Sequence, residues 1–271
     1  MHPLDIHWVL AFGSVALVSG ASLTGMLALS INPGRLARVI PVLVGVAAGA
    51  LLGTAFGHLL PESVERLGSG RLLSVLLVAS FASFFILDKV IGACLRETED
   101  SEGHDHGLHP ATHAAGVKTM RSRPVIVGVL FGAATHSFID GMAIATGYIT
   151  GTQLGLITTF AILLHETPHH IGDVSILIHH GTSIRRSVAL NLMVGSTSAI
   201  GALLVLLLGG RFTAITDVLL PFTTANFIYI ASVNLIPELQ RERGIRESIT
   251  QAAALVFGCL LMLAVAYFIK G

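Results

Sequence analysis

Charged residues are scarce in this sequence of 271 residues, because Asp, Glu, Lys and Arg make up only 12% of it while 53% is hydrophobic. The mean hydropathy of +0.79 is correspondingly high. Such a composition is typical of membrane proteins and excludes an ordinary water-soluble domain. Basic and acidic residues balance at sixteen each, and no basic patch alternates with aromatic residues. Nucleic acid is therefore not an expected partner.

Cysteine is almost absent as well, with Cys94 and Cys259 as the only two. Both fall in apolar segments, where a lone thiol is usually a packing residue, so the sequence indicates neither a disulfide framework nor a redox compartment. The opening segment, MHPLDIHWVL, has no Lys or Arg before its apolar run. We therefore expect this run to be a retained helix rather than a cleaved signal peptide.

Long apolar windows recur along the whole chain. Crossing a hydrocarbon core of ~30 Å takes about 20 helical residues. Eight windows reach that length, although charged residues interrupt the third and the fifth. They are residues 6–30, 39–61, 71–93, 123–148, 153–178, 187–209, 214–237 and 247–269. The sequence thus predicts an all-α polytopic membrane protein, with eight transmembrane helices in a single transmembrane domain over residues 1–271.

The Lys and Arg residues are distributed unevenly between the connecting segments. With the N-terminus outside, twelve of the sixteen fall in or beside the cytoplasmic loops and four fall in the outer segments. Basic residues in short loops are retained on the cytoplasmic side of a membrane. Both termini are therefore predicted to be extracytoplasmic. The short outer loops favour a prokaryotic inner (plasma) membrane as the location.

One long hydrophilic insert, residues 96–122, joins the third and fourth windows. It is rich in acids, Gly and Pro, and it carries His104, His106, His109 and His113. This composition is typical of a flexible segment. Two interpretations remain open, namely a solvated linker with incidental histidines and a flexible cytoplasmic loop that captures metal ions.

The second and seventh windows end in similar strings. Residues 58–62 read HLLPE and residues 234–238 read NLIPE, which match in polarity and spacing. The second window runs outward and the seventh inward, so the same signature falls on opposite sides of the bilayer. This predicts an inverted repeat of spans one to three and six to eight around spans four and five, as in many secondary transporters.

Spans four and five carry an unusual set of polar residues. His136 and Asp140 are four residues apart and share one helical face, as do His165 and His169. A helical rise of 1.5 Å per residue puts His136 roughly 20 Å from the inner side and His165 roughly 18 Å from the outer side. Both pairs are therefore expected near the middle of the bilayer.

Each pair is extended by a neighbouring polar residue, Ser137 in span four and Glu166 in span five, turned by about 100° from the preceding histidine. Ionised Asp140 and Glu166 at this depth need a compensating partner. Since neither span offers a Lys or Arg beside them, a divalent cation is the economical partner for imidazole and carboxylate together. A hydrogen-bonded cluster that joins two helices is the structural alternative.

Five strong donors exceed the four that one tetrahedral zinc ion takes. Two adjacent metal positions that share Asp140 and His169 are therefore the more natural arrangement. The donors are His136, Asp140, His165, Glu166 and His169.

The strings HSFIDGMAIA in span four and HETPHHIGD in span five resemble the signatures of the ZIP (Zrt/Irt-like) divalent metal transporters, most closely the LIV-1-type pattern. The resemblance extends over the whole chain and implies transport of zinc or related ions into the cytoplasm through a two-metal site. It implies a first metal held by His136, Asp140, His165 and His169. It implies a second metal held by Ser137, Asp140, Glu166 and His169.

This chain departs from the family pattern at three positions. Ser137 stands where Asn is usual, and His170 stands where the subfamily has Glu. Ser198 in span six falls where some bacterial members have a bridging Glu. The second metal position is therefore expected to be poorer in carboxylate than in those members.

The string HETPH at residues 165–169 also matches the H-E-x-x-H signature of zinc peptidases, which makes an intramembrane metallopeptidase the alternative function. Such enzymes need a third ligand, generally an Asp in a later span, whereas the only Asp-Gly here, Asp140-Gly141, precedes the motif. Pro168 removes a backbone donor and kinks the helix where the ligands converge. We therefore predict a transporter and not an enzyme.

Further polar residues outline a possible ion pathway. His58 and Glu62 are expected at an outer entrance. His169, His170, Asp173, His179 and His180 are expected to lead toward the cytoplasm, and Asn234 and Glu238 are expected to line the inner path. For His179 and His180 an interfacial position in water is the alternative, and Glu238 could equally cap a helix end.

Zinc is the expected ion because it suits imidazole and carboxylate together, while cadmium, iron(II), cobalt and manganese compete for the same donors. The other expected partners are the lipid bilayer and, as an option left open, a second copy of the chain in a homodimer.

Overall fold

The computed structural model describes residues 3–21, 23, 33–100, 123–179, 181–209, 213–240 and 244–270. Nearly all of them are helical, in eight rods that match the eight predicted windows and confirm an all-α polytopic membrane protein. In chain order the rods are α1 (Pro3–Ala21), α3 with α4 (Pro33–Thr54 and Leu60–Leu67), α5 (Arg71–Asp100), α6 (Arg123–Thr150), α7 (Thr152–His179), α8 with α9 (Ile184–Gly195 and Thr197–Gly209), α10 with α11 (Thr213–Tyr229 and Ile236–Leu239) and α12 (Ile245–Lys270).

Six helical stretches of the described chain are long and apolar enough to cross a membrane. They are Arg38–Leu67, Arg71–Val90, Ile126–Thr150, Ile184–Leu208, Asp217–Leu235 and Ile245–Val265. The described part of the first span, Ile6–Ala21, is apolar but shorter, and the part of its window from residue 24 onward lies outside the described residues. The fifth span, α7, carries the polar motif and is not among the six.

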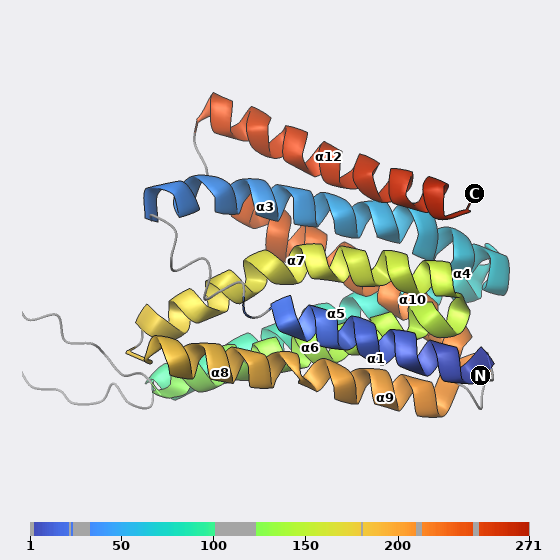
Figure 1. Cartoon of the computed structure of the whole chain (residues 1–271), viewed down its shortest axis with the longest axis horizontal. Helices are drawn as coiled ribbons and strands as arrows, with labels where there is room; N and C mark the ends of the chain where they lie inside the picture. The colour runs from blue at the N-terminus through green and yellow to red at the C-terminus, as the bar shows by residue number, and fades with distance from the viewer. Residues whose placement is uncertain are drawn as a thin grey trace, which may run out of the picture.

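All rods run along the long axis of the molecule (Figure 1). The first and last described residues lie at one end together with α4, and the junction between α7 and α8 lies at the other (Figure 1). We call these the outer end and the inner end, following the charge bias of the loops. The predicted insert begins at the inner end, where its residues 96–100 continue α5 and residues 101–122 lie outside the described residues.

The two matching strings form the same local structure. A π-helical turn over Ala55–Leu59 precedes Pro61, and another over Ile230–Leu235 precedes Pro237. In each case the residue just before the proline donates its N–H to the carbonyl of the residue five positions earlier. Because proline lacks an N–H donor, a widened turn beside it lets the helix continue.

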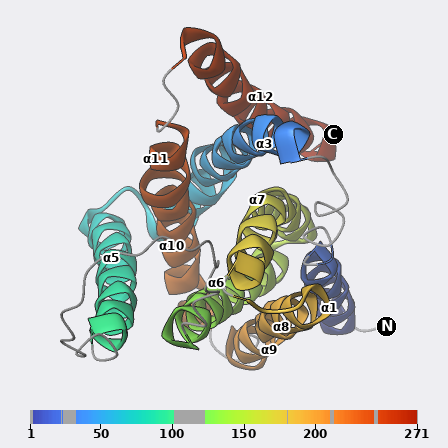
Figure 2. The ribbon, with the colours of Figure 1, turned by 90° about the vertical axis from the view of Figure 1, so that its left-hand side faces the viewer.

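The packing of the rods follows the predicted inverted repeat. Exchanging span one with six, two with seven, three with eight and four with five turns the most extensive contacts between different rods into other observed contacts. Thus α3 packs on α12 as α10 packs on α5, α6 packs on α9 as α7 packs on α1, and α3 packs on α7 as α10 packs on α6. Viewed along the rods, α6 and α7 lie at the centre of this arrangement (Figure 2).

Helices α6 and α9 approach each other so closely that their backbones touch. A Cβ atom at Gly141 would overlap the carbonyl oxygen of Ser198, and one at Gly201 would overlap the carbonyl oxygen of Phe138. Small residues at helix crossings of this kind let membrane helices pack tightly. The contact fixes the turn of α6 that carries Asp140 against a rigid neighbour.

Candidate metal centre

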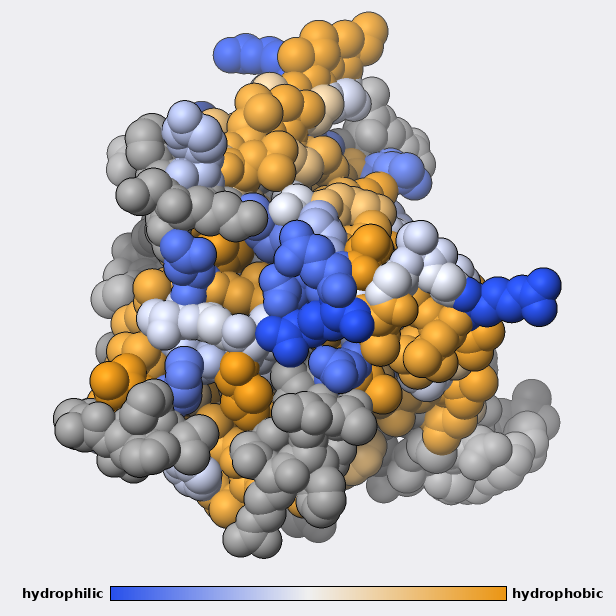
Figure 3. Space-filling model, turned by 90° about the vertical axis from the view of Figure 1, so that its right-hand side faces the viewer, coloured by the Kyte–Doolittle hydropathy of each residue, from blue (hydrophilic) through white to orange (hydrophobic). Residues whose placement is uncertain are grey.

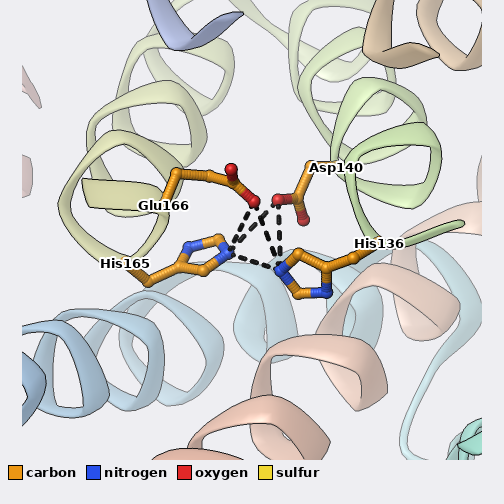
Figure 4. A group of neighbouring side chains, drawn as sticks. All are labelled: His136, Asp140, His165 and Glu166. Carbon is orange, nitrogen blue, oxygen red and sulfur yellow. Dashed lines mark hydrogen bonds and ion pairs between the residues drawn. The ribbon is translucent and has the colours of Figure 1, made fainter. Parts of the chain in front are cut away.

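Four side chains from α6 and α7 converge at the centre of the bundle (Figure 4). They are His136, Asp140, His165 and Glu166, which we call the quartet, and one ligand atom from each lies within 4.8 Å of all the others. The Nε2 atoms of His136 and His165 lie 3.1 Å apart. Sequence spacing placed His136 and Asp140 on one face of α6, and the packing of α6 on α7 brings this face to His165 and Glu166.

The spacing inside the quartet suits a single tetrahedral ion. Nε2 of His136 lies 3.6 Å from Oδ2 of Asp140 and 3.4 Å from Oε1 of Glu166. Nε2 of His165 lies 3.2 Å and 3.8 Å from the same two oxygens. Four ligands at ~2.0–2.2 Å from a tetrahedral zinc ion stand about 3.3–3.6 Å from one another. The four ligand atoms are therefore placed almost as a bound zinc ion would place them.

The quartet is also electrostatically incomplete by itself. Asp140, His165 and Glu166 are each at most 1% exposed. Both oxygens of Asp140 and Oε1 of Glu166 receive no hydrogen bond within the described residues, because the nearby imidazole nitrogens lie at ion-pair distance without hydrogen-bond alignment. No Lys or Arg occurs between residues 124 and 179. Buried carboxylates without donors are costly, and a divalent cation supplies the missing charge.

His169 lies beside the quartet rather than in it. Its ring stacks on the ring of His136, with centroids 4.9 Å apart and planes 6° from parallel. Its Nδ1 is hydrogen-bonded to Oδ2 of Asp173 at 3.0 Å. In the first metal set implied by the family resemblance, the place of His169 is thus taken in this structure by Glu166.

Helix α7 continues through Pro168 from Thr152 to His179, and Figure 1 shows it bent rather than straight. The hydroxyl of Thr167 donates a hydrogen bond to the backbone carbonyl of Leu163. This bond lies in the turn before Pro168, where the helix lacks one backbone N–H donor.

The two serines that replace stronger donors take different positions. Ser137 is buried, 4% exposed, on α6 directly after His136. Ser198 on α9 is 1% exposed, and its hydroxyl lies 2.6 Å from the carbonyl of Gly195 and 3.2 Å from the hydroxyl of Ser19. The hydroxyl of Ser198 is thus engaged with the end of α8 and with α1.

His170, expected on the exit path, instead faces α8. It is 1% exposed, its Nε2 lies 2.7 Å from Oε2 of Glu166, and its Nδ1 lies 3.1 Å from Oδ1 of Asn191. Sequence reasoning missed Asn191, although a polar residue inside an apolar span was a usable signal.

A cavity of about 260 Å³ connects the quartet with the inner half of the bundle, between α5, α6, α7 and α10. His136 lines it, as do His169, Asp173 and Asn234 of the predicted inner path, whose role in ion passage stays a prediction. Asp88 lines it as well and accepts a hydrogen bond from the hydroxyl of Tyr229 at 3.0 Å. In the sequence Asp88 was noticed only as an interruption of the third span.

A second cavity, of about 190 Å³, lies at the outer end and is lined by His58, Glu62, Glu65 and Gln153. Figure 3 shows hydrophilic residues gathered in the middle of this end and hydrophobic residues around them. Glu62 forms an ion pair with Arg66 at 2.8 Å. His58 and Glu62 therefore line a cavity at this end, and their role as an entrance stays a prediction. The side chains of His179 and Glu238, and all of His180, lie outside the described residues.

Apolar side chains separate this outer cavity from the quartet. Ile144 is one turn outward of Asp140 on α6, and Ile162 is one turn outward of Glu166 on α7. Both are completely buried in the core. The quartet thus borders the inner cavity through His136, and buried apolar residues lie one turn outward of it.

Known proteins that are similar to this chain identify its family. A family model described as ZIP Zinc transporter matches residues 5–116 and 95–266. Zinc transporter SLC39A7 of Mus musculus is 28% identical over 98% of this chain and 71% of its own length. Zinc transporter ZIP13 of the same species is 30% identical over 84% and 70%, and the ZIP13 homolog of Drosophila melanogaster is 30% identical over 83% and 77%. With the eight-rod bundle and the family signatures on its two central helices, the chain belongs to the ZIP zinc transporter family.

Proposed function

We propose that this protein carries divalent metal ions, zinc foremost, across the membrane into the cytoplasm, with the quartet as the midpoint of the route. One observation carries the proposal. Four ligand atoms, on three buried side chains and the partly buried His136, stand at spacings near those of a tetrahedral zinc site. Two of them are carboxylate oxygens that receive no hydrogen bond within the described residues, and a cavity lies toward each end of the bundle. The zinc transporters among the relatives support zinc as the ion. Cadmium, iron(II), cobalt and manganese remain competing ions for the same donors.

The geometry favours transport over the peptidase alternative. In an H-E-x-x-H peptidase both histidines bind the metal and the glutamate serves as base. Here Glu166 supplies an oxygen to the quartet, while His169 stacks on His136 and bonds Asp173. The motif is therefore arranged as a ligand set rather than as a peptidase site.

A second ion beside the first is a finer part of the proposal. His169 is close enough to contribute, because its ring already stacks on that of His136 and its Nε2 is not used in the bond to Asp173. A second ion would share Asp140 with the first and draw on Ser137. We expect it to bind more weakly, since Ser137 is a poor ligand and Ser198 is bonded elsewhere.

Orientation and the histidine-bearing insert also remain proposals. Both described ends of the chain lie at one end of the bundle, which the charge bias assigns to the extracytoplasmic side. The relatives compared are animal proteins, so they lend no support to a prokaryotic membrane. We propose that residues 96–122 hold ions near the exit without shaping the central site. Replacing the four histidines of this insert by Ser should change apparent affinity modestly and leave ion selectivity intact, and complete loss of uptake with normal expression would contradict this role.

The test of the main proposal is zinc uptake into liposomes that contain the purified protein and a zinc-sensitive dye. We expect the wild type to transport zinc and His165→Ala to abolish uptake while remaining folded in detergent. Ser175→Ala is the matched control, because Ser175 lies on the same helix and its hydroxyl bonds only the backbone carbonyl of Ile171. Wild-type uptake by His165→Ala would remove the quartet from the mechanism, and metal-dependent peptide cleavage would revive the peptidase.

A further inference from the structure

The two carboxylate oxygens of Glu166 have different surroundings. Oε1 faces the quartet, 3.4 Å from Nε2 of His136 and 3.8 Å from Nε2 of His165. Oε2 faces the other way and lies 2.7 Å from Nε2 of His170. Figure 4 shows one oxygen of Glu166 pointing into the quartet and the other away from it. One side of the carboxylate thus faces the quartet, and the other lies at ion-pair distance from His170.

His170 is itself held in place by α8. Its Nδ1 lies 3.1 Å from Oδ1 of Asn191, and the Asn191 amide nitrogen lies 3.5 Å from the backbone oxygen of His170. Glu166, His170 and Asn191 are each 1% exposed. Two contacts to the same asparagine fix both the amide and the imidazole ring. The chain of contacts therefore runs from α8 through His170 to one oxygen of Glu166.

Deepening the function proposed above, we propose that His170, anchored by Asn191, is a positioning residue that makes Glu166 a ligand through Oε1 alone. His170 lies outside the residues that border the inner cavity, so it acts through Glu166 and not on the passing ion. Groups that orient a metal ligand in this way typically change metal affinity by about 10–100-fold when removed.

The arrangement also bears on ion choice. A carboxylate that binds through one oxygen completes a four-ligand tetrahedral set, which zinc prefers. A carboxylate free to offer both oxygens raises the coordination number and suits ions of octahedral, oxygen-rich geometry such as manganese. His170 should therefore favour zinc over manganese, because its contact with Oε2 leaves only Oε1 of Glu166 to bind the ion. It is a determinant of specificity that does not touch the ion.

Metal binding to the purified full-length protein tests this directly. Equilibrium dialysis with zinc and with manganese would be run on wild type, His170→Leu, His170→Gln and Asn191→Leu, with Ser175→Ala as the control. X-ray absorption at the zinc edge would report the number and type of ligand atoms. Both readouts are independent of transport, and thermal unfolding in detergent would show which variants are folded.

We expect His170→Leu to weaken zinc binding by about 10–100-fold and to narrow the preference for zinc over manganese. Asn191→Leu should act in the same direction with a smaller effect. His170→Gln should keep most of the zinc affinity, because its amide can still donate to Oε2. The double variant His170→Leu with Asn191→Leu should be no worse than His170→Leu alone, since both residues act through one carboxylate.

Three outcomes would overturn the inference. The first is a folded Asn191→Leu variant whose zinc affinity and preference for zinc over manganese are both unchanged. This variant tests the inference even if His170→Leu does not fold. The second is loss of affinity in His170→Gln equal to that in His170→Leu. The third is an X-ray absorption spectrum in which zinc bound to His170→Gln has one imidazole ligand fewer than zinc bound to the wild type. That result would show that His170 itself binds the ion. In all three the wild type still binds zinc, whereas absence of zinc binding and uptake in the wild type would refute the proposed function itself.

Discussion

Nε2 of His136 on α6 and Nε2 of His165 on α7 lie 3.1 Å apart, although the two residues are separated by 29 positions in the chain. Two imidazole nitrogens at this separation share a proton or a cation, because two lone pairs facing each other would repel. With Asp140 and Glu166 on either side, a cation is the more favourable occupant. The predictions that follow depend on this arrangement.

Replacing Asp140 by Asn should abolish stabilisation by zinc without unfolding the protein. The substitution keeps the shape and removes a buried charge whose oxygens receive no hydrogen bonds within the described residues. A ligand present at 100 times its dissociation constant stabilises the folded state by about 2.7 kcal/mol. Thermal unfolding in detergent, with and without zinc, would measure the shift. A zinc-dependent shift of equal size in Asp140→Asn and wild type would remove Asp140 from the site.

Zinc binding should weaken as the pH falls through about 6. A metal-bound imidazole must be neutral, and an ordinary histidine has a pKa of ~6.5, so protons compete with the ion for His136 and His165. Zinc binding is therefore stronger at high pH and is lost on acidification, and the weaker second ion is lost first. Equilibrium dialysis at about pH 7.5 and about pH 5.5 gives the stoichiometry. Equal zinc binding at both values would show that these histidines are not the main ligands.

Adding a single methyl group at Gly141 should destabilise the contact between α6 and α9. A Cβ there would overlap the carbonyl oxygen of Ser198 on α9, and overpacking of this kind costs about 1–3 kcal/mol. Gly132→Ala is the matched control, because it lies on the same helix and a Cβ there meets nothing within 4 Å. Thermal unfolding of the two variants would be compared. Equal stability would mean that α6 and α9 are less tightly packed than described.

Asp88→Asn should slow transport without weakening zinc binding at the quartet. Asp88 borders the inner cavity, where its charge attracts a departing cation, but it is not one of the quartet ligands. We expect a several-fold lower maximal uptake rate with an unchanged dissociation constant for zinc. Tyr229→Phe, which removes only the hydroxyl bonded to Asp88, serves as the conservative comparison. A parallel loss of zinc binding would place Asp88 in the central site instead.

Much of this protein follows from its sequence through local rules. A span of apolar residues must be helical in lipid, because each backbone polar group has to be satisfied within its own segment. Helical spacing then puts His136 with Asp140, and His165 with His169, on shared faces at similar depth. The matching strings HLLPE and NLIPE predicted the repeat, and both form a π-helical turn before the proline.

Tertiary structure alone decided which of the central donors meet. Glu166 joins the quartet while His169 stacks beside it, and the packing of α7 on α6 decides which side chains of the two helices meet. The same holds for His170, which sequence spacing assigned to the exit path. Its direction depends on Asn191, a residue 21 positions away on α8, and no rule of helical periodicity connects residues on different helices. Contacts between helices therefore determine whether a polar residue of α7 faces the quartet, the inner cavity or a neighbouring helix.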